Sequence, residues 1–388
     1  MLKVVDLFSG AGGLTFGFQK RIYRNRFVDN DRFNVVFANE YDSSAAEAFR
    51  INFPNIPMLE EDISNLDEEY LKKMYLDLVN IDLVIGGPPC QSFSTVGKRQ
   101  YDNRAKMYKE YRRILSIIKP KVFIFENVLG LLTMKNDNGT PVIDDVEASF
   151  KDFSDFDDDL SYTIYKSILN AQDYGVPQSR ERVFLVGIKN GLEIRSPWKF
   201  PQPTTVNNKI SVREAISDLP CLVNGSGTKF YQKKPETSYQ YLMRGNQKIL
   251  NNHVNGYNGP RMQKIMESVI EGEGRPYINK LVNEGILPPE LYLTSGYRNT
   301  YGRLWWDKPS TTITNNLSTP SSLRCIHPKQ NRALTSREGA RLQSFPDNFV
   351  FVGSKEKINS QIGNAVPPLL SIQLAEAISD FFKNNFEN

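Results

Sequence analysis

The sequence predicts an α/β fold in which an open, mostly parallel sheet is joined to a second, smaller and less regular domain. Short apolar runs rich in β-branched residues, typical of buried parallel strands, alternate with helical segments in the first half of the chain. Past Glu193 this alternation fades, and Asn, Gly, Pro, Tyr and Lys become frequent up to about Asn331. We therefore expect residues 1–192, completed by 356–388, to form the sheet domain and residues 193–355 to form the second domain.

The first expected strand, Lys3–Phe8, runs into a glycine turn at Ser9–Gly13 and then into a helix from about Leu14 to Gln19. Backbone N–H groups at such a turn and helix start can receive an anion, although a glycine turn alone is a weak signal. A second strand, Val35–Asn39, ends in Glu40. An acidic residue at the end of the second strand commonly binds a ribose diol.

A helical stretch, Ser43–Asn52, leads to the pair Asp62 and Ile63 near the next strand position. A carboxylate beside an apolar side chain suits an adenine amino group and its ring. A solvated turn explains the same two residues equally well.

The next strand, Ile81–Ile85, is stopped by two glycines and two prolines, and Cys90 follows them. The carboxyl end of a strand in an open sheet is the usual ligand position, and Pro88 and Pro89 stiffen the loop that holds the thiol. A lone cysteine in such a loop is more often a small buried hydrophobe, so the other residues of the site must decide between the two readings.

Two further segments are expected to supply charged side chains at the edge of the sheet where the parallel strands have their carboxyl ends. The strand Lys121–Phe125 ends in Glu126, after a helix over about Arg104–Ile118. Beyond a strand near 162–169, the segment QSRERVFLVG places Arg180 and Arg182 on one side of an extended chain, because side chains alternate with a period of two. Two guanidinium groups are therefore expected to converge on one site.

The second domain interleaves basic and aromatic residues, as in YQKK and YRNTYGRLWW. This pattern favours phosphate contacts combined with stacking, although an irregular domain with ordinary surface lysines has the same composition. A helix is expected over Arg261–Glu271 and a capped one over Ser336–Gln343. The last expected helix is Leu369–Phe382.

Composition bounds the class of protein. The 388 residues carry a net charge of +4, so any nucleic-acid surface must come from local clustering of basic residues. Three widely spaced cysteines argue against a disulfide framework and two histidines against a zinc cluster, so we expect no metal and a reducing, cytoplasmic location. No apolar run approaches the ~20 residues of a membrane span, and the amino terminus starts into a strand rather than a signal peptide.

Seven blocks in this order resemble the DNA cytosine-5 methyltransferase family: DLFSGAGG, NEYD, GGPPCQSFS, ENV, QSRERVFLVG, REGARLQSFPD and IGNAVPP. The resemblance covers most of residues 1–192 and 333–370, and the region between is variable in the family. It implies a Rossmann-like sheet that binds S-adenosylmethionine, with a second, target-recognition domain. It also implies a bacterial modification enzyme, paired with a restriction endonuclease and monomeric.

The resemblance implies the chemistry of the site. The thiolate of Cys90 would add to carbon 6 of cytosine with electrostatic help from Arg180, Glu126 would act as an acid at nitrogen 3, and Arg182 would hold the exocyclic oxygen. The glycine turn would receive the carboxylate of the cofactor. The implied cofactor pocket is formed by Phe8, Gly10, Gly12, Leu14, Glu40, Asp62, Ile63, Pro88, Asn364 and Val366.

The target base must be flipped out of duplex DNA, and the loop from Cys90 to Arg104 would close over it, with Gln91, Ser94 and Arg104 toward the DNA. Thr312 and Ile313 match a short signature of the family's recognition region. Arg298 and Arg303 are weaker candidates for guanine contacts, and a structural salt bridge explains either equally well.

Other classes fit less well. A nicotinamide-dependent dehydrogenase would use the glycine turn and Glu40 but leave Cys90 and Glu126 without a role. A cysteine hydrolase needs a general base, and both histidines lie in the irregular domain. A tRNA cytosine-5 methyltransferase of the same family keeps the mechanism and changes the substrate, and a non-catalytic DNA-binding relative would not need Cys90.

Overall fold

The computed structural model describes residues 1–74, 80–89, 107–136 and 138–387. Its centre is a seven-stranded sheet in the order β5-β4-β1-β6-β7-β9-β8. All neighbours are parallel except the pairs that β9 makes with β7 and β8. The strands are β1 Leu2–Leu7, β4 Phe33–Glu40, β5 Met58–Glu60, β6 Leu83–Gly86, β7 Val122–Val128, β8 Tyr162–Asn170 and β9 Glu181–Lys189. The predicted open, mostly parallel sheet is confirmed.

The order of the strands places a topological switch point at β1. From β1 the chain moves outward through β4 to β5, and it then returns to the other side of β1 to form β6 and β7. Ligands of open α/β sheets bind outside the carboxyl ends of the strands at such a point, because the connections leave in opposite directions and open a crevice.

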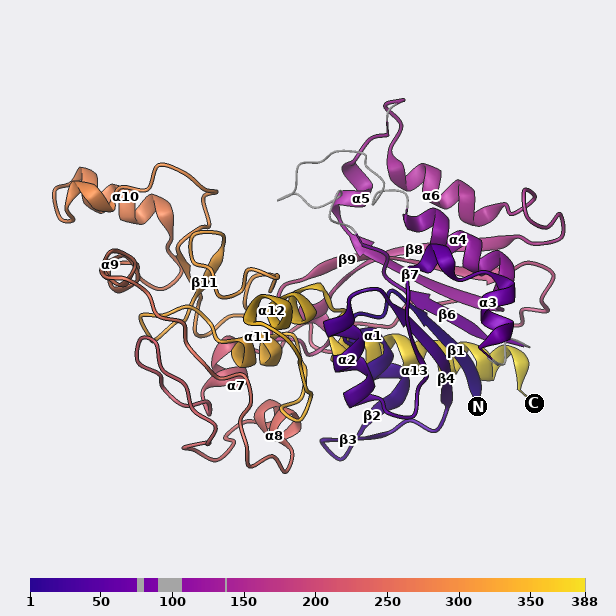
Figure 1. Cartoon of the computed structure of the whole chain (residues 1–388), viewed down its shortest axis with the longest axis horizontal. Helices are drawn as coiled ribbons and strands as arrows, with labels where there is room; N and C mark the ends of the chain where they lie inside the picture. Colours follow the sequence, from indigo (N-terminus) through magenta and orange to yellow (C-terminus); the bar gives the residue numbers. More distant parts are fainter. Residues whose placement is uncertain (75–79, 90–106, 137, 388) are drawn as a thin grey trace.

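Helices cover both faces of the sheet, which produces two apolar cores (Figure 1). One core joins the sheet to α1, α2 and α13, and the other joins it to α3, α4 and α6. The helices around the sheet are α1 Gly13–Gln19, α2 Ser43–Asn52, α3 Glu68–Lys73, α4 Met107–Ile118, α5 Gly130–Thr133, α6 Val142–Lys151 and α13 Pro368–Phe386.

The last helix, α13, packs directly against the first, α1. A Cβ atom on Gly17 of α1 would lie 2.2 Å from the backbone carbon of Ser371 in α13, so only glycine allows the two backbones to approach this closely. The hydroxyl of Ser371 donates to the carbonyl of Leu14. The two ends of the chain thus meet on one face of the sheet.

Most of the remaining elements form a second lobe beside the sheet, with α9 and α10 at its outer end (Figure 1). Its elements are α7 Val212–Ile216, α8 Ser238–Arg244, α9 Pro260–Ser268, α10 Arg275–Asn283, β10 Gly302–Arg303, β11 Arg324–Ile326 and α11 Ser336–Leu342. The next helix, α12 Lys355–Asn364, contacts both α11 and α2 and so lies between this lobe and the sheet. The core beneath α1 and α13 continues into this lobe through Trp198, Leu304 and Phe345, whereas α9 and α10 have a core of their own. The boundaries expected at 192 and 355 stay a prediction.

The second lobe is organised around a group of fully buried charges, which we call the α11 cluster: Arg332, Arg337, Glu338, Arg341, Asp218 and Asp347. Arg341 donates to both carboxylates, reaching Asp347 at 2.5 Å and Asp218 at 3.1 Å. Arg332 forms two bonds to Glu338, at 2.8 and 2.7 Å. The expected cap of α11 is confirmed, because Thr335 and Glu338 form a reciprocal capping box.

Two further observations complete the description of the fold. Between α1 and β4 the chain forms an antiparallel hairpin of two strands, β2 Lys20–Tyr23 and β3 Arg26–Asp29. Within the described ranges, no helix is both long and apolar enough to cross a membrane.

Candidate active site and cofactor cavity

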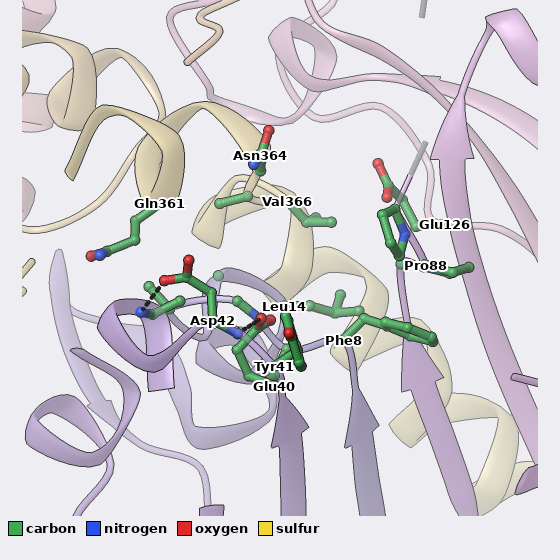
Figure 2. A pocket seen from close by; sticks show the side chains of 18 of the residues that line it. Phe8, Leu14, Glu40, Tyr41, Asp42, Pro88, Glu126, Gln361, Asn364 and Val366 are labelled. Atoms are coloured by element: carbon green, nitrogen blue, oxygen red, sulfur yellow. Dashed lines mark hydrogen bonds between the residues drawn. The ribbon is translucent and has the colours of Figure 1, made fainter. Parts of the chain in front are cut away.

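A cavity of about 450 Å³ opens at the carboxyl ends of β1, β4, β6 and β7. A volume of this size is typical of small-molecule sites. Figure 2 shows Glu126 and Pro88 at one end of the cavity and Glu40 at the other, with Phe8 between them and Asn364 and Val366 approaching from α12 and the segment after it. The switch point of the sheet therefore holds the pocket that the strand order leads one to expect.

The turn after β1 forms the floor of the cavity. Phe8 lies at φ 56°, in the left-handed region that non-glycine residues rarely adopt, and Gly10 lies at the same φ. Such backbone strain is concentrated at ligand sites, because the surrounding structure must hold it in place. Phe8, Gly10 and Leu14 line the cavity, as expected.

Gly12, which was expected in the cofactor pocket, lies at the start of α1 and packs against α2. It is absent from the cavity lining and starts α1 at φ 97°. A Cβ atom there would lie 2.4 Å from the ring of Phe53. Gly12 is needed for the backbone turn and its packing on α2, and its expected cofactor contact stays a prediction.

Glu40 is held in place by backbone donors. Its carboxylate accepts from the N–H of Gly10 at 2.8 Å and from the N–H of Asp42 at 2.7 Å. Burial raises its pKa, and these two hydrogen bonds oppose the rise. One N–H of the glycine turn is therefore engaged by Glu40 rather than open to the carboxylate of a ligand.

Asp62 and Ile63 lie together on the cavity wall. Oδ1 of Asp62 caps a short 3₁₀ turn, accepting from the hydroxyl of Ser64 at 2.7 Å and from its N–H at 2.9 Å, and these two bonds lower the pKa of Asp62. Ile63 is buried beside it. The arrangement offers an apolar surface with an ionised carboxylate at its edge, which suits an aromatic ring with an amino group.

At the other end of the cavity Glu126 forms an ion pair with Arg182, with 3.1 Å between Oε1 and Nε. Both side chains are largely buried. Burial raises the pKa of Glu126, and the charges of Arg182 and Arg180 oppose that rise. A carboxyl with a raised pKa keeps its proton to higher pH than an ordinary carboxyl does, which favours a role as an acid at a ring nitrogen.

Arg180 lines the same cavity, so the expected convergence of two guanidinium groups is confirmed. The side chain is almost fully buried, with 2% of its surface exposed. Its Nη atoms donate to the carbonyls of Ile313 and Gly363, both at 3.0 Å. Arg180 thereby links the sheet to the second lobe and to α12.

The loop before Cys90 is fixed against Glu126. A Cβ atom on Gly87 would lie 2.7 Å from Oε2 of Glu126, so the glycine permits the close approach. Asn127 is buried and donates to the carbonyl of Pro88 at 3.4 Å. Pro88 lines the cavity, whereas Cys90, Gln91, Ser94 and Arg104 lie outside the described residues.

The carboxyl-terminal part of the chain closes the cavity. Asn364 and Val366 line it as expected. The sequence reading missed Lys357 and Gln361 of α12, and Lys357 forms an ion pair with Asp42 of the α2 cap. It also missed Asp6, although this residue opens the DLFSGAGG block.

Four residues expected to contact DNA lie in the second lobe, namely Arg298, Arg303, Thr312 and Ile313, and only Arg298 is exposed. Arg303 is buried, and its guanidinium donates to the carbonyls of residues that include Val269 and His327, both at 2.7 Å. The expected guanine contact of Arg303 is therefore wrong, because the side chain holds the lobe together. Arg298 is exposed.

The Thr312–Ile313 pair also faces inward. Ile313 is 1% exposed and packs in the core, while its N–H donates to Gln178 at 2.6 Å. The hydroxyl of Thr312 donates to the carbonyl of Ser179. Ile313 cannot contact DNA from this position, and we correct its expected role to one of docking the second lobe onto the segment before β9.

Comparisons with known proteins decide the family. Residues 2–380 match the family model described as C-5 cytosine-specific DNA methylase. The chain belongs to this family. The Type II methyltransferase M.DdeI of Desulfomicrobium norvegicum is 34% identical over 396 residues, which cover 99% of this chain and 90% of that protein. M1.HphI of Haemophilus parahaemolyticus is also 34% identical, over 97% of this chain and 86% of its own.

Solved structures agree with the sequence relatives. The crystal structure of a prophage-encoded E. coli protein described as a DNA modification methyltransferase aligns with a TM-score of 0.74, with 26% identity over 99% of this chain and all of that one. The DNMT2 structure from Spodoptera frugiperda, at 15% identity and a TM-score of 0.57, shares the fold. The chain is thus a DNA cytosine-5 methyltransferase of the type II restriction-modification kind, with the Rossmann-like sheet of S-adenosylmethionine-dependent enzymes.

The residues present fit such a cofactor. The cavity joins the buried carboxylate of Glu40, an apolar wall with Asp62 at its edge and a glycine turn in one enclosure. Among the described residues, no group of three or more His, Cys, Asp or Glu side chains is arranged to hold a metal ion.

Proposed function

We propose that this DNA cytosine-5 methyltransferase acts on a flipped cytosine through a covalent bond between Cys90 and carbon 6 of the base. The observation that carries the proposal is the Glu126–Arg182 pair at the end of the cavity where the Pro88–Pro89 loop leads to Cys90. Carbon 5 of cytosine is a poor nucleophile, and addition of a thiolate at carbon 6 turns the ring into an enamine that can be alkylated.

Each polar group at this end of the cavity has a task in that reaction. Glu126, whose pKa is raised by burial, donates a proton to nitrogen 3 as electrons move toward it. Arg182 holds the exocyclic oxygen of the base and keeps Glu126 in position. The positive charge of Arg180 favours the thiolate over the thiol of Cys90.

The other end of the cavity binds S-adenosylmethionine, which supplies an electrophilic methyl group when it is bound. Glu40 binds the ribose hydroxyls, and Asp62 with Ile63 and Phe8 binds the adenine. Asn364 and Val366 close the site from the carboxyl-terminal side. Carbon 5 of the enamine accepts the methyl group, then loses its proton as the thiolate of Cys90 is expelled.

The substrate we propose is duplex DNA, from which the cytosine is extruded at a cost of a few kcal/mol. Residues 1–192 with 356–388 form the catalytic domain, and residues 193–355 read the sequence. Gln91, Ser94 and Arg104 approach the sugar-phosphate, and exposed Arg298 approaches a base edge. We further propose that the enzyme works as a monomer beside a cognate restriction endonuclease.

Bisulfite sequencing of plasmid DNA treated with the enzyme would identify the target sequence. A duplex carrying 5-fluorocytosine at that position should then trap the enzyme as a covalent adduct, because fluorine at carbon 5 cannot leave as a proton does. Cys90→Ser should form no adduct and retain binding of S-adenosylhomocysteine. A Cys90→Ser protein with unchanged methylation would overturn the mechanism, and methylation of tRNA in place of DNA would move the substrate to RNA.

A further inference from the structure

The β2–β3 hairpin exposes arginines that the fold itself does not use. The basic residues at its two ends form ion pairs. Arg21, Arg24 and Arg26 are exposed, and none of them forms an ion pair within the described ranges. Arg21 and Arg24 instead lie over the ring of Tyr23, with their guanidinium carbons 5.8 and 5.2 Å from its centroid. The end of the hairpin thus presents three positive charges and an aromatic ring to solvent.

The turn of the hairpin keeps an arginine at a backbone position that arginine disfavours. Arg24 and Asn25, the two residues between the strands, lie at φ 48° and 55°. Two-residue hairpin turns with positive φ at both positions favour Asn, Asp and Gly, because other side chains are strained in the left-handed region. Asn25 meets this preference and Arg24 does not. Backbone strain of this kind is concentrated at functional sites, which points to a binding role for the guanidinium.

The hairpin continues into a basic surface of the second lobe. β3 contacts α8, and the side-chain amide of Asn25 donates to the carbonyl of Ser238 at 3.0 Å. Figure 1 shows β3 and α8 at the same, lower edge of the view. Residues 20–32 include five Lys and Arg residues and two acidic ones, and residues 219–258 include five and one. Since the whole chain carries a net charge of only +4, positive charge is concentrated on these two segments.

This surface lies away from the cofactor cavity. The hairpin leads into the amino end of β4, and the carbonyl of Arg32 accepts from the N–H of Leu2 at the start of β1. The cavity opens at the other end of these strands. β4 has eight residues, so its two ends are roughly 25 Å apart. The basic surface is therefore separate from the site that receives the target base.

The chemistry of the surface fits the phosphate backbone of DNA. Guanidinium groups bind phosphate oxygens through paired hydrogen bonds, and exposed lysines such as Lys233 and Lys234 add to the attraction. DNA is the polyanion on which this family of enzymes acts. Once one stretch of a long DNA molecule occupies the active site, other stretches of the same molecule are present at high local concentration.

We propose that the β2–β3 hairpin and residues 229–248 form a second DNA-binding surface, which holds a segment of duplex other than the one at the active site. The inference goes beyond the proposed function and does not depend on the covalent chemistry of Cys90. Arg21, Arg24 and Arg26 contact phosphates and read no sequence. One chain then holds two segments of DNA together and can pass from one to the other without release.

Capture of a second duplex tests the proposal. The full chain is loaded at low salt onto beads that carry a biotinylated plasmid fragment, and a short fluorescent duplex of A·T base pairs is then added. The wild-type chain should retain the fluorescent duplex. The triple variant Arg21→Gln/Arg24→Asn/Arg26→Gln should retain about tenfold less, and the slope of log affinity against log salt should become shallower by about 2 to 3, because each lost phosphate contact removes about 0.9. The control Lys72→Gln/Lys151→Gln/Lys383→Gln removes the same charge from exposed lysines elsewhere and should change the slope by less than about 0.5.

The outcomes separate the inference from the proposed function. No capture by the wild-type chain, as expected if the surface serves an acidic protein, would overturn the inference, and so would equal capture by the triple variant. The triple variant should methylate a short target duplex with kcat within about twofold of the wild-type value, because the surface does not touch the cavity. Loss of that activity in a folded variant would move the arginines to the active-site DNA. A wild-type chain that methylates no DNA would overturn the proposed function and leave the capture measurement intact.

Arg24→Asn alone distinguishes a lost contact from a misfolded hairpin. Asparagine is tolerated at positive φ, so this variant should melt at the wild-type temperature or above it. It should nevertheless make the salt slope shallower by about 0.9, the share of one phosphate contact. An unchanged slope would remove Arg24 from the surface, and a lower melting temperature would show that this arginine serves the fold.

Discussion

The cofactor cavity and the α11 cluster both bury charged side chains, yet they satisfy them differently. In the α11 cluster, Arg341 faces two carboxylates and Arg332 binds Glu338 through two bonds. In the cavity, an oxygen of Asp6 has no donor among the described residues, and Glu126 keeps a raised pKa despite its arginine. Complete pairing marks a group that holds the fold, whereas incomplete pairing or a perturbed pKa marks a group waiting for a ligand.

Arg182 and Arg303 show the same difference between a residue at the cavity and a residue that holds the fold. The sequence placed both Arg182 and Arg303 at nucleobases. Arg182 forms an ion pair with one carboxylate at the cavity, that of Glu126. Arg303 instead donates to main-chain carbonyls from several segments. The comparison predicts that substitution of a fully paired buried charge will lower the free energy of unfolding. Substitution of a charged residue at the cavity should instead change catalysis or ligand binding.

The largest effect is expected from Arg341→Ala. Removing this guanidinium leaves Asp218 and Asp347 buried without a full partner, which typically costs about 3–5 kcal/mol of unfolding free energy. Urea unfolding followed by circular dichroism would measure the loss. Arg341→Lys keeps the positive charge but not the planar guanidinium, so it should lower the free energy of unfolding by less than Arg341→Ala does. Equal losses in the two variants would contradict this account of the cluster.

Glu126→Gln should lower kcat by about two to four orders of magnitude, as expected for loss of a general acid. The fold should remain, since the amide is close in shape to the carboxyl. Methyl transfer from labelled cofactor would measure kcat, with binding of S-adenosylhomocysteine as the control. Full activity in this variant would remove Glu126 from the mechanism.

Arg303→Ala and Arg298→Ala should separate stability from specificity. Loss of the buried guanidinium leaves several carbonyls without donors, for which we expect a destabilisation of about 2–3 kcal/mol. Exposed Arg298→Ala should leave unfolding unchanged and alter the set of methylated sequences. A stable Arg303→Ala protein with an altered target profile would restore the guanine contact to Arg303.

The smallest effect is expected on the pH dependence of the melting temperature of the ligand-free protein. The pKa of Asp6 rises on folding from 3.8 to about 7, so its contribution to stability is present below pH 3.8 and is lost as pH increases through about 7. Asp6→Asn should therefore have a higher melting temperature than the wild-type chain at pH 8, by roughly 2 °C or more. A melting temperature that falls at pH 8 would show that the carboxylate is stabilising there.

The sequence located the site because its residues follow strands. Glu40 and Glu126 end β4 and β7, and parallel strands bring their carboxyl ends to one edge. The sequence could not place Arg303 or Ile313 correctly, because the carbonyls and the core that receive them come from distant segments. Asp6 was missed for a related reason: a short apolar strand does not reveal that one of its polar atoms lacks a partner.

The packing of α13 on α1 has a consequence for synthesis of the enzyme. Asn364, Val366 and α12 complete a cavity whose floor is made by the turn after β1, so a nascent polypeptide that has not been extended as far as Val366 lacks one wall of its cofactor site. Methylation must therefore await the synthesis and folding of α12 and the segment after it. A truncated product from a broken message would be unable to modify DNA, however well its first strands had folded.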